Sequence, residues 1–169
     1  MLFPPAFVMF IGALILPFLS GTSRTVVASV ISGLALYILW STPDGSFLKF
    51  DFLDYELILL KNDALARVFG TIFSITAFVG ALFAMKQNSA LELSAAFAYA
   101  GGALGVILAG DLITVFLFWE VMALTSTAII WANKTKRSYR ASMRYLLLHL
   151  FGGVLLMVGI IGKIVENGS

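Results

Sequence analysis

Six long apolar runs dominate this sequence and set its structural class. At a rise of about 1.5 Å per residue, a helix needs close to 20 apolar residues to cross roughly 30 Å of hydrocarbon. The 169-residue chain is 60% hydrophobic and 12% charged, whereas soluble domains carry about 25% charged residues. So short a chain cannot bury this apolar excess in a core of its own. We therefore predict an all-α membrane protein, one transmembrane domain over residues 1–169, with spans at 2–19, 25–41, 67–86, 93–109, 112–132 and 141–163.

The fourth and fifth runs form one nearly continuous apolar stretch, broken only at Gly110-Asp111. Because that stretch is far too long for a single crossing, we predict two helices joined by a tight turn. The fourth run carries Gly101, Gly105 and Ala109 at four-residue spacing. Small residues so placed allow helix backbones to approach closely in lipid, so we assign this stripe to packing.

The charges between the runs differ in sign from one side to the other. Loop 133–140 and the start of the last run are basic and contain no acid, whereas loop 42–66 is mainly acidic. Basic loops stay in the cytoplasm, so we expect a multi-pass protein of a prokaryotic cell membrane with both termini outside. The residues that fix this orientation are Arg24, Lys86, Lys134, Lys136, Arg137, Arg140 and Arg144 on the inside, against Asp44, Asp51, Asp54, Glu56 and Asp63 outside.

Loop 42–66 has a pattern of its own. Apolar and polar residues alternate after the turn signal Pro43-Asp44-Gly45, and a second extended run begins near Tyr55. Alternation with a period of two on both sides of a short break predicts a β-hairpin on the outer surface. Two roles remain open for it, a clasp onto a neighbouring subunit or a lid over the chain's own helix ends.

Glu120 is the residue on which the functional hypothesis depends. It lies nine residues after Asp111, about 13 Å along a helix and therefore near the bilayer midplane. A charged side chain there costs about 2.5–3.5 kcal/mol on insertion scales. The residues one turn away are apolar and cannot pair with it. Glu120 must then be either protonated or paired with a cation from another helix, and both states suit proton transfer. The structural alternative is a buried glutamic acid that only bonds between helices.

Few other polar residues could form a proton relay with Glu120. Thr125 and Ser126 follow on the same predicted helix, and Tyr145 and His149 lie four apart on one face of the last helix. Imidazole changes its charge near neutral pH, so His149 could supply protons from the cytoplasmic side. An interhelical hydrogen bond is the alternative role for His149. Arg144 is a possible charge partner for Glu120 if it faces inward.

The sequence lacks the residue patterns of disulfides, of the usual metal sites and of nucleophilic catalysis. The chain has no cysteine and a single histidine, which leaves neither disulfides nor the usual histidine or cysteine metal clusters. No nucleotide-binding loop or nucleophile constellation is visible. We therefore expect a transporter subunit rather than an enzyme, with no cofactor and no metal. The net charge of +2 reflects the basic loop and does not indicate nucleic acid.

The residues around Glu120 resemble a known family. The run AGDLITVFLFWEVMALTSTAIIW, followed by a basic loop and RASMRYLLLHLFGG, is similar to the antiporter-like membrane subunits of Mrp-type multisubunit Na⁺/H⁺ antiporters, and most similar to the D-subunit kind. The superfamily includes proton-pumping subunits of respiratory complex I and of membrane-bound hydrogenases. The resemblance implies that Glu120, within Phe118-Trp119-Glu120-Val121-Met122, is the essential glutamate of the fifth helix.

The sequence also departs from that family. The resemblance implies about fourteen helices around two inverted repeats, and a lysine on the seventh helix that pairs with the glutamate. This chain has six predicted helices and no such lysine, since Lys163 sits at the outer end of the last one. We expect a split subunit, completed by another polypeptide of a membrane complex, although a truncation would look the same. The expected partners are other membrane subunits, lipid, monovalent cations and H⁺.

Three functions remain open at this point. The leading hypothesis is part of the ion-translocating subunit of a monovalent cation/proton antiporter, with the proton path through Glu120. The second is a proton-pumping piece of a redox-driven complex such as a hydrogenase or a NADH dehydrogenase-like assembly, whose cofactors lie in other subunits. The third is a structural or assembly subunit.

Overall fold

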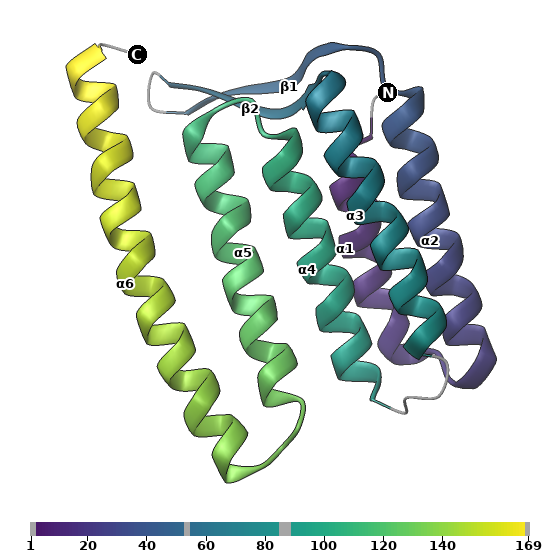
Figure 1. Cartoon of the computed structure of the whole chain (residues 1–169). Helices are drawn as coiled ribbons and strands as arrows, with labels where there is room; N and C mark the ends of the chain where they lie inside the picture. The colour runs from purple at the N-terminus through teal and green to yellow at the C-terminus, as the bar shows by residue number, and fades with distance from the viewer. Residues whose placement is uncertain (1–2, 53–54, 85–88, 168–169) are drawn as a thin grey trace.

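The computed structural model describes residues 3–52, 55–84 and 89–167, so Lys86 and Asp54 lie outside the described residues. It is a helical bundle with a small β-hairpin at one end (Figure 1). Both the all-α class and the hairpin are confirmed. The elements are α1 (Pro5–Ile15), η1 (Leu16–Phe18), α2 (Gly21–Ser41), β1 (Gly45–Phe52), β2 (Tyr55–Asn62), α3 (Ala64–Phe83), α4 (Ala90–Leu108), α5 (Leu112–Trp131) and α6 (Lys136–Asn167).

Five of these helices, α2 to α6, are long and apolar enough to cross a membrane. The first predicted span is shorter than expected, because α1 gives way to the 3-10 turn η1 at Leu16. Pro17 lacks the N–H that an α-helix would need at that point. In contrast, α6 begins at Lys136, before the predicted start at residue 141. Thr135 and Ser138 exchange hydrogen bonds of 2.9 and 3.0 Å between side chain and backbone N–H, which caps the new helix start.

The helices form a group of four with two more added at one edge (Figure 1). Helices α1 to α4 pack around a shared core that includes Met9, Ala28 and Leu104, all fully buried. Helix α5 lies against α4, and α6 packs mainly on α5. The hairpin, the start of α1 and the end of α6 lie at one end of the bundle, and the α5–α6 turn lies at the other.

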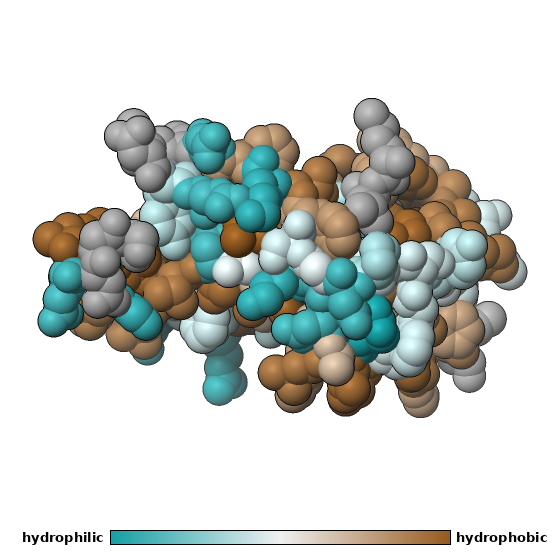
Figure 2. Space-filling model, turned by 90° about the horizontal axis from the view of Figure 1, so that it is seen from above, coloured by the Kyte–Doolittle hydropathy of each residue, from teal (hydrophilic) through white to brown (hydrophobic). Residues whose placement is uncertain are grey.

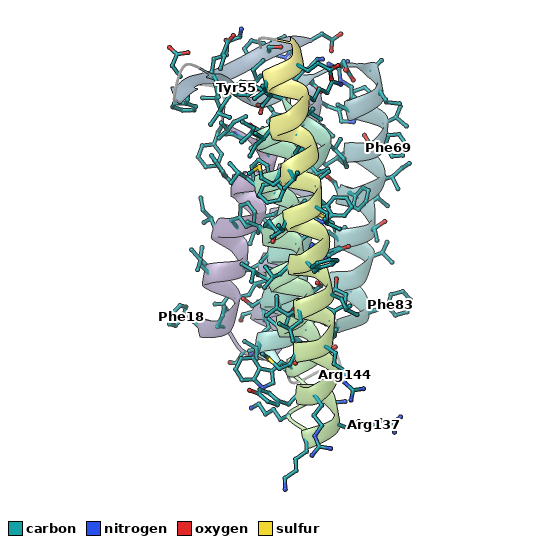
Figure 3. The ribbon with its side chains drawn as sticks, turned by 90° about the vertical axis from the view of Figure 1, so that its left-hand side faces the viewer. Phe18, Tyr55, Phe69, Phe83, Arg137 and Arg144 are labelled. Atoms are coloured by element: carbon teal, nitrogen blue, oxygen red, sulfur yellow. The ribbon has the colours of Figure 1, made fainter. Side chains whose placement is uncertain are left out.

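The outer surface of the bundle is apolar along its length and hydrophilic at its ends. Phe18, Phe69 and Phe83 point outward from the bundle, whereas Arg137 and Arg144 lie at the end opposite Tyr55 (Figure 3). Seen from the hairpin end, hydrophilic residues gather over the middle and hydrophobic ones surround them (Figure 2). This is the surface that a lipid environment requires.

The glycines of α4 account for its close packing on both sides. A Cβ atom at Gly101 would lie 3.1 Å from the α1 backbone oxygen of Ala6. One at Gly102 would lie 2.7 Å from Met122 of α5, and one at Gly105 would overlap the ring of Phe118. The packing role predicted for this stripe is therefore confirmed. Helix α5 can lie close against α4 because Gly102 and Gly105 have no side chains.

The hairpin is tied to the turn between α4 and α5. The Gly110 N–H donates to the Ile58 carbonyl at 2.8 Å, and the Ile58 N–H donates to Asp111 Oδ2 at 2.6 Å. Asp111 Oδ1 also caps α5 by accepting from the Thr114 N–H at 2.8 Å. The hairpin thus covers the chain's own helix ends. A second role as a clasp onto a neighbouring subunit stays a prediction.

Candidate functional site

Glu120 lies in the interface between α5 and α6. Its Oε1 atom is buried and has no hydrogen-bond partner within the described part of the chain. Glu120 faces the α6 backbone at Gly153, where a Cβ atom would contact Oε1 directly. The missing side chain of Gly153, which is itself buried, makes the space that the carboxyl group occupies. The site therefore depends on a glycine that the sequence marks only as part of a family motif.

His149 lies one helical turn before Gly153, toward the basic end of the bundle. That spacing of four residues is about 6 Å along the axis. Its ring packs between two aromatic side chains, with centroid separations of 6.0 Å to Trp119 and 6.0 Å to Tyr145. Its Nε2 atom is also buried without a hydrogen-bond partner in the described structure. Buried polar atoms nearly always have a hydrogen-bond partner. Glu120 Oε1 and His149 Nε2, which have none in the described structure, therefore need an explanation.

A cavity of about 270 Å³ lies beside these groups and reaches α4. Its lining comes from three helices: Tyr99, Trp119, Met122, Ala123, Tyr145 and His149. Tyr99 was missed from sequence because nothing in its own segment marks it, and it enters only through the packing of α4 on α5. Trp119, the residue before Glu120, packs against His149 with the two ring planes tilted by 33°.

Among the other predicted relay residues, Ser126 and Tyr145 are in contact, whereas the Thr125 hydroxyl bonds to its own helix. The hydroxyl groups of Ser126 and Tyr145 lie 3.0 Å apart and are hydrogen-bonded, which links α5 to α6, and Ser126 Oγ also donates to the Ala123 carbonyl at 2.9 Å. Thr125 instead donates to the carbonyl oxygens of Val121 and Met122 on its own helix. The Thr125 hydroxyl therefore forms no hydrogen bond to the described residues of α6.

No cation of the described chain neutralises Glu120. Arg144 is exposed near the basic end of the bundle (Figure 3) and forms no ion pair with a described carboxylate. Lys163 is exposed near the other end of α6. No group of three or more potential metal ligands is found among the described residues either. The site, as far as it is described, holds a proton acceptor, an imidazole and no fixed countercharge.

A known protein family and several known sequences match the part of the chain that contains this site. Residues 109–169, which contain α5 and α6, match the family described as NADH:quinone oxidoreductase/Mrp antiporter, transmembrane. The chain is 31% identical over 109 residues to the D-type subunit of the Na⁺/H⁺ antiporter of Alkalihalophilus pseudofirmus, covering 61% of this chain and 22% of that one. It is 22% identical over 151 residues to the D-type subunit of the Bacillus subtilis antiporter, covering 82% of this chain and 29% of that one.

A solved structure shares the fold. The chain superposes on a chain of the membrane-bound sulfane sulfur reductase, an archaeal respiratory membrane complex, with a TM-score of 0.77 and 22% identity, covering 97% of this chain and 37% of the other. This chain spans between about a fifth and a third of the length of the two curated antiporter relatives. The resemblance predicted from the sequence is thus confirmed: the chain is a multi-pass membrane protein that is similar to antiporter-like membrane subunits over the stretches given above.

Proposed function

We propose that this chain is part of an ion-translocating membrane subunit of a multisubunit monovalent cation/proton antiporter in a prokaryotic cell membrane, and that Glu120 carries the transported proton. The observation that supports this most is the Oε1 atom of Glu120, which is buried in the α5–α6 interface and has no hydrogen-bond partner among the described residues. A carboxylate with no countercharge is costly to place in hydrocarbon, so this position favours a protonated carboxyl group or a carboxylate with a cation beside it. In this proposal the arrival of a cation and the release of the proton are coupled.

Three further side chains and a cavity extend this site toward the basic side. His149 is one turn of α6 from the position facing Glu120, and Tyr145 is one turn further, hydrogen-bonded to Ser126. The cavity of about 270 Å³ beside His149 and Tyr145 is large enough for water, which could bridge the gap of roughly 6 Å between the two turns. In this proposal His149 passes protons from the cytoplasm to Glu120. Thr125 has its hydroxyl engaged on its own helix and could act only after that bond breaks.

The cation that Glu120 needs comes, in this proposal, from further helices, whether of another polypeptide or of a longer form of the same one. Helix α6 packs mainly on α5, and it exposes Leu148, Val154 and Val158. Those residues are where such helices would pack. Arg144 could serve only if its exposed side chain turned inward in the assembled complex. The described chain alone is not expected to transport ions.

A redox-driven proton pump is the second candidate, and the shared fold with a chain of an archaeal respiratory complex favours it. In that case the electron-carrying groups would belong to other subunits, while Glu120 would still carry protons. Co-purification of iron–sulfur or flavin proteins with the chain would distinguish this candidate from an antiporter. A purely structural or assembly role would leave Glu120 without a part in transport.

The test uses the complete complex in inverted membrane vesicles, with a fluorescent probe of the pH gradient. Glu120→Gln should lower cation-driven proton flux at least tenfold, because glutamine keeps the shape of the side chain but cannot release a proton. Glu120→Asp should retain part of the flux. Glu166→Gln, at the exposed end of α6, is the matched control and should transport normally.

The amount of assembled complex must be equal in all variants. Normal flux in an assembled Glu120→Gln complex would rule out the proton-carrying role and leave the structural alternative. Loss of flux in Glu120→Gln without loss of assembly would exclude that alternative.

A further inference from the structure

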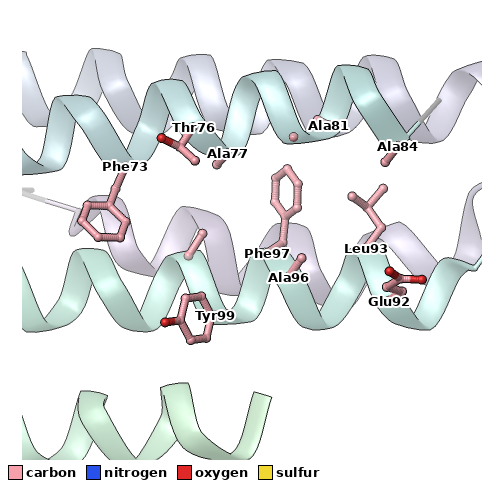
Figure 4. Close-up of a pocket in the computed structure, with 12 residues that line it drawn as sticks. Phe73, Thr76, Ala77, Ala81, Ala84, Glu92, Leu93, Ala96, Phe97 and Tyr99 are labelled. Carbon is pink, nitrogen blue, oxygen red and sulfur yellow. The ribbon is translucent and has the colours of Figure 1, made fainter. Parts of the chain in front are cut away.

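A groove runs between α3 and α4 on the basic half of the bundle (Figure 4). Its volume is about 300 Å³, and it extends from Phe73 in the middle of α3 to Ala84 just past the end of that helix. Eleven residues of helix correspond to about 16 Å, which is close to half of the roughly 30 Å hydrocarbon thickness. The groove therefore matches the depth of one leaflet.

The groove wall is apolar and open. Ala77, Ala81 and Ala96 are among its small lining residues, and Phe97 projects into it from α4. A Cβ atom at Gly80 would meet no atom within 4 Å, so this glycine leaves the groove wide rather than permitting contact between the helices. An apolar channel of this shape fits a hydrocarbon chain.

Glu92 lies at the basic end of the groove and also lines a second, polar cavity. That cavity has a volume of about 590 Å³, and its polar lining residues are Ser89, Glu92, Asn133, Lys134 and Ser138. Glu92 is half-buried and Lys134 exposed, and neither forms an ion pair within the described residues. One acid and one base, both free in the described part of the chain, thus face the same polar space beside the mouth of the apolar groove.

We propose that this pair of cavities binds an aminophospholipid of the leaflet on the basic side. One acyl chain lies in the α3–α4 groove, the headgroup ammonium lies against Glu92, and the phosphate lies against Lys134. Charge complementarity decides the headgroup class. A purely anionic lipid would satisfy Lys134 but would place negative charge near the Glu92 carboxylate. A headgroup that carries both an amine and a phosphate satisfies both residues.

The experiment uses the full chain in vesicles that contain phosphatidylethanolamine with a photoactivatable group in one acyl chain. After irradiation, mass spectrometry locates the lipid adducts on the protein. We expect adducts concentrated on residues 73–84 and 92–100. Gly80→Leu should reduce them at least fivefold by filling the groove. Gly33→Leu is the matched control, because Gly33 also has open space around its Cβ position but lies on α2, and it should not change labelling.

The headgroup is tested separately with phosphatidylethanolamine and phosphatidylglycerol probes of identical acyl chains. We expect the wild-type groove to favour phosphatidylethanolamine at least threefold, and Glu92→Gln should bring that ratio to about one while acyl labelling persists. Equal labelling of wild type and Gly80→Leu would overturn the proposal, as would a preference for phosphatidylglycerol. A crosslink from Gly80→Cys to another polypeptide in native membranes would show a protein occupant and would overturn it too.

Discussion

The carboxyl group of Glu120 lies directly against the backbone of α6 at Gly153, where any β-carbon would contact Oε1. Glu120 supplies the proton-binding atom and Gly153 supplies the space for it. The two residues are 33 positions apart in the chain, yet they fix how α5 and α6 align. The same alignment brings Ser126 to Tyr145, two turns nearer the basic end.

We predict that Gly153→Ala separates α5 from α6 or moves the Glu120 carboxyl group, and that ion flux by the complete complex falls about tenfold. The neighbouring Gly152→Ala is the control, because a Cβ there meets nothing within 4 Å. Flux in inverted vesicles is the measurement. If both alanine variants transport equally well, the contact between Glu120 and Gly153 is not needed for transport.

A second prediction concerns His149. If His149 passes protons to Glu120, His149→Gln should slow transport by each assembled complex several-fold, because glutamine can form hydrogen bonds in the same space but cannot take up and release a proton. A packing role alone would lower the amount of folded complex and leave the rate per complex unchanged. Transport rates normalised to the amount of complex therefore separate the two roles.

The Ser126–Tyr145 hydrogen bond should contribute modestly to the free energy of unfolding. Interhelical hydrogen bonds in membranes average about 0.6 kcal/mol in double-mutant cycles. We expect Ser126→Ala and Tyr145→Phe each to destabilise the chain, and their coupling energy to be between about 0.3 and 1.5 kcal/mol. Reversible unfolding in mixed micelles would measure it. A coupling energy of zero would mean that the bond at 3.0 Å is not formed in lipid.

Asp111 should hold the hairpin in place as well as cap α5. Asp111→Ala is expected to cost about 1–2 kcal/mol of stability and to speed amide hydrogen exchange at Ile58, whose N–H donates to Asp111. Asp63→Ala is the matched control. Asp63 caps α3 through the Ala66 N–H but does not bind Ile58, so exchange at Ile58 should stay slow in that variant.

Tyr55 gives a pH-dependent signature of the docked hairpin. Burial, and to a lesser extent the Asp111 carboxylate, raise the pKa of Tyr55 above its ordinary value of 10.0. The unfolded tyrosine ionises first as pH rises, so the stability from Tyr55 is complete below about pH 10 and is lost as pH passes the raised pKa. Ultraviolet titration, with Tyr55→Phe to identify the signal, should show ionisation above pH 10. Asp111→Asn should lower that pKa only in part, since burial remains.

Much of this architecture was predictable because the bilayer restricts the options. Apolar length alone located the spans, and alternating polarity located the hairpin, with errors at helix ends where capping decides. The early start of α6 depends on the reciprocal bonds of Thr135 and Ser138, which hydropathy does not register. The position of Glu120 within α5 followed from its distance along the sequence to Asp111, which caps that helix.

The partners of Glu120 across the interface were not predictable. They depend on the rotation and register of α6 against α5, which are set by side-chain packing rather than by hydropathy. That is why Gly153 and Tyr99 emerged only from the structure, while Thr125, plausible from sequence, bonds to its own helix.

The most direct test of the proposed function is whether Glu120 changes its protonation state during transport. Infrared difference spectroscopy of the complete complex can follow the carbonyl stretch of a protonated carboxylic acid when the transported cation is added. We predict that this band disappears on cation addition in the wild type and is missing from the Glu120→Gln difference spectrum. An identical difference spectrum in both proteins would contradict the proposal that Glu120 carries the proton.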